Sequence, residues 1–128
     1  MTKEEFEKLI QKAIESFPLK IKKLLDNVVV VVEDLPDDEI TKKLNLPNKY
    51  ALFGLYQGIP KTKRGVRYGN VLPDKITLFQ KPIEKIAQEP KKIEEIVKKT
   101  LWHEIAHHFG FDEREVRKLE KKKFQNNV

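Results

Sequence analysis

The chain has 128 residues, a length that fits one domain, residues 1–128, around one hydrophobic core. It contains no cysteine, which excludes disulfide bonds and cysteine-ligated metal sites, so any metal ion must be held by His, Asp or Glu. Charged residues make up 36% of the chain with a net charge of +6, which indicates a well-charged surface and a composition typical of heat-adapted proteins.

The sequence indicates neither a signal peptide nor a membrane span. The first residues are acidic and amphipathic, without the apolar core of a signal peptide. The longest apolar run, residues 28–32, is far shorter than the about 20 residues that cross a bilayer as a helix. We therefore expect a cytoplasmic protein without a membrane partner.

The first predicted element is an amphipathic helix. Its apolar residues run from Phe6 to Phe17 at intervals of three and four positions, which places them on one face. Thr2 is a suitable N-cap, and Glu5 can complete a capping box with it. Pro18 ends this helix and can be the first residue of a short second helix through position 25.

Three strands are predicted in the middle of the chain. Residues 28–32 are all β-branched and indicate a buried strand. Residues 35–49 are polar and have room for one or two helical turns, and residues 50–56 predict a second strand. A basic loop covers residues 61–70, and residues 75–80 predict the third strand.

Helices are predicted for the rest of the chain. A short one covers residues 83–88, and a long one covers residues 90–109 and is ended by Gly110. A last helix is predicted over residues 112–124. Because the connections are short, the order of helix, strand, strand, strand, helix, helix predicts an α+β fold, with helices packed on a small sheet.

The long helix contains a His-Glu-x-x-His motif, formed by His103, Glu104 and His107. Histidines four positions apart lie on one face of a helix, so both imidazoles can bind one Zn²⁺ ion. Glu104 lies about 100° further round the helix from His103 and can take the proton of a water that the metal acidifies. The motif therefore predicts zinc-dependent hydrolysis of a carbonyl compound, with Glu104 as the general base.

A helical wheel places His103, Glu104 and His107 in line with the apolar stripe formed by residues such as Ile96 and Val97. Polar groups on a buried face are costly unless they are paired, and a metal ion would remove that cost. The alternative is a pair of core histidines that hydrogen-bond to their neighbours, with Glu104 in an ion pair.

The third metal ligand is expected shortly after the motif. Gly110 can turn the chain back towards the metal, and the position that supplies the third ligand in related motifs holds Glu113. Asp112 is the alternative ligand, although it is also a suitable N-cap with Glu115 completing the capping box. His108 points away from the two ligand histidines and is expected in a supporting or core role.

The sequence resembles the minimal bacterial zincins, a family of small zincin-like metallopeptidases. The resemblance covers most of residues 28–116. It is carried by His-Glu-Ile-Ala-His-His-Phe-Gly at 103–110, Gly-Leu-Tyr-Gln-Gly-Ile-Pro at 54–60, Tyr-Gly at 68–69 and Leu-Pro-Asp-Lys-Ile-Thr-Leu-Phe at 72–79. It implies a minimal zincin fold, with a small sheet over the motif helix, and a metallopeptidase function. The family commonly has Asp at the position that Glu113 occupies here, so the chain departs from the family at the expected third ligand.

Three functions compete at this stage. For a zinc peptidase that acts on a peptide or protein, residues 75–80 would be the sheet edge that pairs with an extended substrate, and the alternative is an ordinary strand of the sheet. The basic loop could attract acidic segments, and the alternative is an ordinary solvated loop. A non-catalytic, zincin-shaped module for binding metal or protein is the alternative, but it would not need Glu104. Nucleic-acid binding through the net charge is not expected, because acidic residues alternate with the basic ones along the helices.

Overall fold

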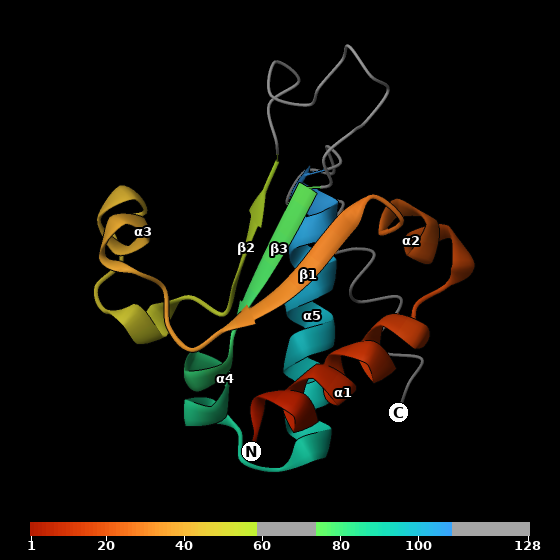
Figure 1. Ribbon diagram of the computed structural model, residues 1–128, viewed down its shortest axis with the longest axis horizontal. Helices are drawn as coiled ribbons and strands as arrows, with labels where there is room; N and C mark the ends of the chain where they lie inside the picture. Colours follow the sequence, from red (N-terminus) through yellow and green to blue (C-terminus); the bar gives the residue numbers. More distant parts are fainter. Residues whose placement is uncertain (59–73, 109–128) are drawn as a thin grey trace.

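The structure is a computed structural model that describes residues 1–58 and 74–108. These residues form a three-stranded mixed sheet with helices packed on it, which confirms the predicted α+β class. Helix α5 (Pro90–His108) runs behind the sheet, and α1 (Lys3–Glu15) crosses the lower part of α5 (Figure 1). Among the described helices, none is long and apolar enough to span a membrane.

The sheet has the strand order β1-β3-β2. Strand β3 (Asp74–Phe79) pairs in parallel with β1 (Val28–Glu33) and antiparallel with β2 (Gly54–Gln57). The expectation that the third strand is an edge is therefore wrong, because β3 is hydrogen-bonded on both sides. Its side chains are also the most deeply buried of the three strands, as a central position requires.

Strand β1 is less buried than its run of five valines predicts. Val32 is buried, whereas Val29 is 43% exposed. Successive side chains of a strand point to opposite faces, and the face of β1 that carries Val29 is left open to solvent. The prediction of a strand is confirmed here, but the prediction of burial on both faces is wrong.

The N-terminal helices follow their local signals. The Thr2 hydroxyl accepts a hydrogen bond from the Glu5 N–H at 3.1 Å, and the Glu5 carboxylate accepts one from the Thr2 N–H at 3.0 Å, which confirms the capping box. Pro18 is the N-cap residue of the short helix α2 (Leu19–Leu24), one position before the first helical residue that the sequence predicts it to be. The buried side chains of α1 and of the residues after it are Phe6, Ile10, Ala13 and Phe17.

The second strand begins later than the sequence predicts. Helix α3 (Asp38–Lys43) accounts for the helical turns expected between residues 35 and 49. The 3₁₀ helix η1 (Lys49–Ala51) follows, because the Asn48 side chain accepts a hydrogen bond from the Tyr50 N–H at 2.8 Å. The strand predicted from residue 50 therefore starts only at Gly54.

Helix α4 (Gln80–Ile86) begins three residues before the predicted start at 83 and ends two before the predicted end. Gln80, expected as the last residue of the third strand, opens this helix. Its side-chain amide donates to the Glu84 carboxylate at 2.7 Å and to the Met1 carbonyl at 2.9 Å. Pro82 lies in the first turn, where a helix does not need its N–H.

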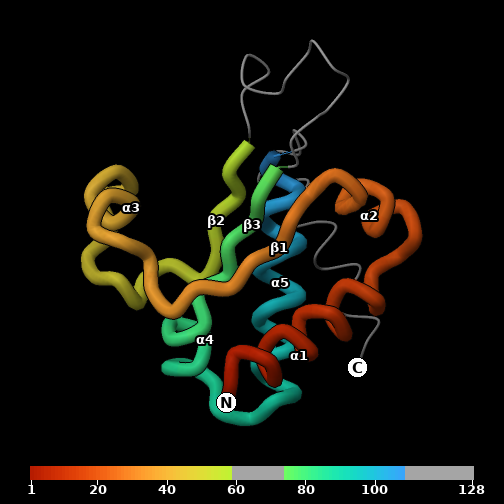
Figure 2. The backbone as a smooth tube through the Cα atoms, in the orientation of Figure 1, coloured from red at the N-terminus to blue at the C-terminus, as the bar shows by residue number. Residues whose placement is uncertain are grey.

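Helix α5 begins at Pro90 as predicted and is described as far as His108. It packs against both α1 and the sheet, so the first and last described helices meet in the core (Figure 2). The fully buried side chains include Phe6, Ile76, Leu78, Ile83, Ile93, Val97, Leu101 and Ile105. Gly110, the predicted helix 112–124 and the basic loop 61–70 lie outside the described residues.

Candidate metal and catalytic site

The histidine pair lies on the last two turns of α5. The Nε2 atoms of His103 and His107 are 3.0 Å apart, and the two rings meet edge to face with their centroids at 4.4 Å. Two ring nitrogens bound to one tetrahedral zinc ion, each at about 2.0–2.1 Å, would lie about 3.3 Å apart. The two side chains therefore converge in the way that a shared zinc ion requires.

The burial of these residues differs from the helical-wheel prediction. The buried face of α5 carries Val97, Leu101 and Ile105, whereas His103 and Glu104 are half-buried and His107 is exposed. Leu101 lies about 160° round the helix from His103, so the two histidines lie on the side of the helix away from the buried face. This position leaves the histidines open to solvent and to a substrate, which a core position would not.

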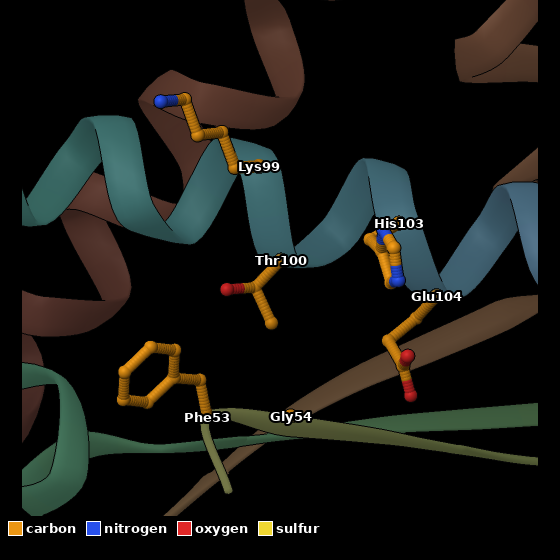
Figure 3. A pocket seen from close by; sticks show the side chains of 6 residues that line it. All are labelled: Phe53, Gly54, Lys99, Thr100, His103 and Glu104. Carbon is orange, nitrogen blue, oxygen red and sulfur yellow. The ribbon is translucent and has the colours of Figure 1, made fainter. Parts of the chain in front are cut away.

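Glu104 points from α5 towards the sheet (Figure 3). Its Oε1 atom accepts a hydrogen bond from the backbone N–H of Tyr56, on β2, at 2.9 Å. Burial raises the pKa of Glu104, and this effect outweighs the lowering by the Tyr56 N–H and by the positive charges that His103 and His107 can carry. The carboxylate is therefore a stronger base than an exposed glutamate.

The Tyr56 N–H belongs to the outer edge of β2. In an antiparallel pair, alternate residues of a strand turn their backbone groups towards the partner and away from it. The Phe53 carbonyl accepts from the Phe79 N–H at 2.9 Å, so the backbone groups of Gly54 and Tyr56 point away from β3. The outer edge of β2, and not of β3, therefore lies beside Glu104.

A cavity of about 320 Å³ lies between α5 and β2. In Figure 3 the side chains of Thr100 and Glu104 point towards the strand, whereas Lys99 points away from it. A Cβ atom on Gly54 would lie 2.6 Å from the Thr100 Cγ2 atom, so glycine is what allows β2 to approach α5 so closely. The residues that line the cavity are Phe53, Gly54, Lys99, Thr100, His103 and Glu104.

The structure brings Asp74 and the Tyr56 side chain to the site, and the sequence pattern assigns neither of them a role. Asp74 accepts a hydrogen bond from the Tyr56 hydroxyl at 2.8 Å, and His108 contacts the same carboxylate at 3.4 Å. His108 thus has the supporting position that its angle on the helix predicts. The available signal for Asp74 was an acidic residue directly before a strongly apolar strand, where a buried charge needs partners.

The expected third ligand cannot be placed. Glu113 and Asp112 both lie outside the described residues. Within residues 1–58 and 74–108, no three His, Asp or Glu side chains are grouped so that they could hold a metal ion. Of the expected ligands, the described residues contain only His103 and His107.

A helix that carries two convergent histidines and a carboxylate, packed against a small mixed sheet, defines the zincin class of metalloproteins. The family model described as zincin-like metallopeptidase matches residues 25–123, and the chain belongs to this family. The resemblance and the fold that it implies are thus confirmed, and membership suggests a zinc-dependent peptidase. No curated protein matches the chain.

Proposed function

We propose that this protein is a zinc-dependent metallopeptidase in which His103 and His107 bind the metal and Glu104 is the general base. Glu113 is proposed as the third ligand, with Asp112 as the alternative. One observation carries the proposal: a half-buried carboxylate lies beside two histidine nitrogens 3.0 Å apart, at the edge of a strand. Family membership supports it.

The roles of the residues follow from this geometry. His103 and His107 would hold the zinc ion, which would supply a Lewis acid for the scissile carbonyl and for a water molecule. Glu104 removes a proton from that water as the water oxygen forms a bond to the carbonyl carbon. The protonated Glu104 then donates the proton to the amine nitrogen as the C–N bond breaks, which returns the carboxylate to its starting form.

The proposed substrate is an extended segment of a peptide or protein. The backbone groups of Gly54 point out from the edge of β2, on the same side as the Tyr56 N–H that donates to Glu104. An extended chain can add to such an edge through main-chain hydrogen bonds. We therefore propose that an extended substrate pairs with β2, and not with residues 75–80 as the sequence predicts.

The test compares zinc-loaded wild type with Glu104→Gln on a broad library of unstructured peptides at neutral pH. The amide is nearly the same size as the carboxylate but cannot accept the water proton, so the rate should fall about 100- to 10,000-fold. Zinc content should stay the same in both proteins, and thermal unfolding, measured in parallel, should show that both are folded.

Equal cleavage by the two proteins would show that the activity does not use Glu104 and would contradict the proposed mechanism. A second outcome favours the alternative function. If both proteins bind zinc and the same protein partner equally well and neither cleaves any peptide, the chain is a zincin-shaped binding module.

A further inference from the structure

A buried carboxylate that the proposed reaction does not use lies close to the site. Asp74, the first residue of β3, is only 8% exposed. Its Oδ2 atom accepts the Tyr56 hydroxyl at 2.8 Å and lies 3.4 Å from the Nε2 atom of His108. The Tyr56 and His108 rings are stacked, with their centroids at 3.8 Å and an angle of 14° between their planes. We call these three residues the Asp74 cluster.

The Asp74 cluster holds the Tyr56 side chain in two directions. A hydrogen bond from a hydroxyl to a carboxylate is charge-assisted and stronger than a neutral one, and it fixes the end of the side chain. Stacking on His108 fixes the face of the ring. Since the three residues come from β2, β3 and α5, the cluster ties the strand pair to the end of the helix that carries the site.

The main chain of the same tyrosine contacts the proposed general base. The Tyr56 N–H donates to the Glu104 carboxylate at 2.9 Å, so Tyr56 joins the Asp74 cluster through its side chain and Glu104 through its backbone. A shift of Tyr56 would move the donor that orients this carboxylate. The direction of a general base relative to its substrate sets the rate of proton transfer.

We propose that Asp74 is a positioning residue for Glu104 and acts through Tyr56, with His108 holding the tyrosine ring. Its effect on catalysis rests on the proposed peptidase function. The geometric part of the inference does not, because the hydrogen bond between the Tyr56 N–H and Glu104 can be measured in the zinc-free protein.

The experiment uses Tyr56→Phe, which removes the hydroxyl and keeps the stacked ring, with Asp74→Asn as a second variant that keeps an acceptor. Tyr50→Phe is the matched control, since Tyr50 is an exposed tyrosine on η1 whose ring lies below the Lys85 ammonium group. NMR hydrogen exchange reports the backbone amide of residue 56. The amide of Phe79, which bonds Phe53 across β2 and β3, reports the strand pair itself.

We expect exchange at residue 56 to be at least about tenfold faster in Tyr56→Phe than in wild type, with the Phe79 amide unchanged. Asp74→Asn should give a smaller change at the same amide. Two results would overturn the inference. One is exchange at residue 56 as slow as in Tyr50→Phe, and the other is equal acceleration at Phe79, which would mean that the cluster only holds the strands together.

A zinc-loaded measurement connects the geometry to catalysis. On a peptide that wild type cleaves, Tyr56→Phe should lower kcat about 10- to 100-fold and leave KM unchanged. A change in KM alone would overturn the positioning role. Failure of the peptidase proposal would appear as absent zinc or absent cleavage in wild type, whereas failure of this inference would appear as unchanged exchange at residue 56.

Discussion

Helix α5 presents two faces to different parts of the molecule. On one face, Val97, Leu101 and Ile105 are fully buried against the rest of the core. On the other, His103 is half-buried and His107 is exposed. Because a helix turns about 100° per residue, residues close in sequence lie on different faces. Core packing and the proposed metal binding thus use separate side chains, and each should respond to its own substitutions.

The largest expected effects come from one substitution on each face of α5. His107→Ala should weaken zinc binding by at least about 100-fold, because the loss of a ligand should exceed the 10- to 100-fold effect of a residue that only supports one. Leu101→Ala should lower the free energy of unfolding by about 2–5 kcal/mol, because it leaves a cavity in the core. Zinc titration and urea denaturation of both variants measure the two effects.

The zinc-free proteins give the cross-check. His107 is exposed, so His107→Ala should change the zinc-free stability by less than about 0.5 kcal/mol. Leu101→Ala should keep its zinc affinity under conditions where it is folded. If His107→Ala unfolds the zinc-free protein, the two faces are not independent and His107 has a structural role.

The second prediction extends the comparison to the expected third ligand, which lies outside the described residues. Glu113→Ala should weaken zinc binding at least about tenfold. Asp112→Ala should mainly cost stability, about 1 kcal/mol, because the helix predicted over residues 112–124 would lose its N-cap. Zinc titration and thermal unfolding of both variants distinguish these effects, and the reverse pattern would assign the ligand to Asp112.

The third prediction concerns the contact between α5 and β2. Gly54→Ala would place a methyl group 2.6 Å from the Thr100 Cγ2 atom and 3.2 Å from the Leu78 Cδ2 atom, so we expect a loss of about 1–3 kcal/mol in the free energy of unfolding. The double variant Gly54→Ala/Thr100→Ser lacks the closest methyl group and should regain part of that loss. Urea denaturation of the single and double variants tests this, and a neutral Gly54→Ala would show that the strand can move away from the helix.

The smallest effect is a pH dependence of the zinc-free protein. Burial raises the pKa of Glu104 above its ordinary value of 4.5, so the folded protein keeps this proton to a higher pH than the unfolded chain does. The resulting stabilisation is complete below 4.5 and is lost as the pH rises through the raised pKa. Glu104→Gln has no such proton, so wild type should lose stability relative to this variant as the pH rises above 4.5. Urea denaturation at a series of pH values measures the difference, and a constant difference would mean that Glu104 is not desolvated.

Local patterns account for what the sequence predicts correctly. The capping box of α1 depends on Thr2 and Glu5, three positions apart, and the start of α5 depends on Pro90. The pairing of His103 with His107 follows from one helical turn. Each of these features is set by residues within a few positions of one another, so a single sequence contains the whole signal.

The features that the sequence does not predict involve distant residues. The central position of β3 depends on which strands pair with it, and no local pattern specifies that choice. Tyr56, Asp74 and His108 meet from three separate elements. The sequence also predicts the wrong buried face for α5. The buried face depends on the elements that pack against the helix, α1 among them, and these are distant in the sequence.

The parallel pairing of β1 with β3 has a consequence for how the chain acquires its structure. Val28 lies opposite Asp74 in the register, so this pairing joins segments that are far apart in the sequence. The apolar side chains of α1 pack against α5, which is the last described helix. Contacts between such distant segments form slowly, because a long loop must close before they can contribute. During synthesis on the ribosome, Phe6 and Ile10 therefore remain uncovered until nearly all of the described chain has emerged. The opposite face of α1 carries lysine and glutamate residues, whose charges favour contact with water.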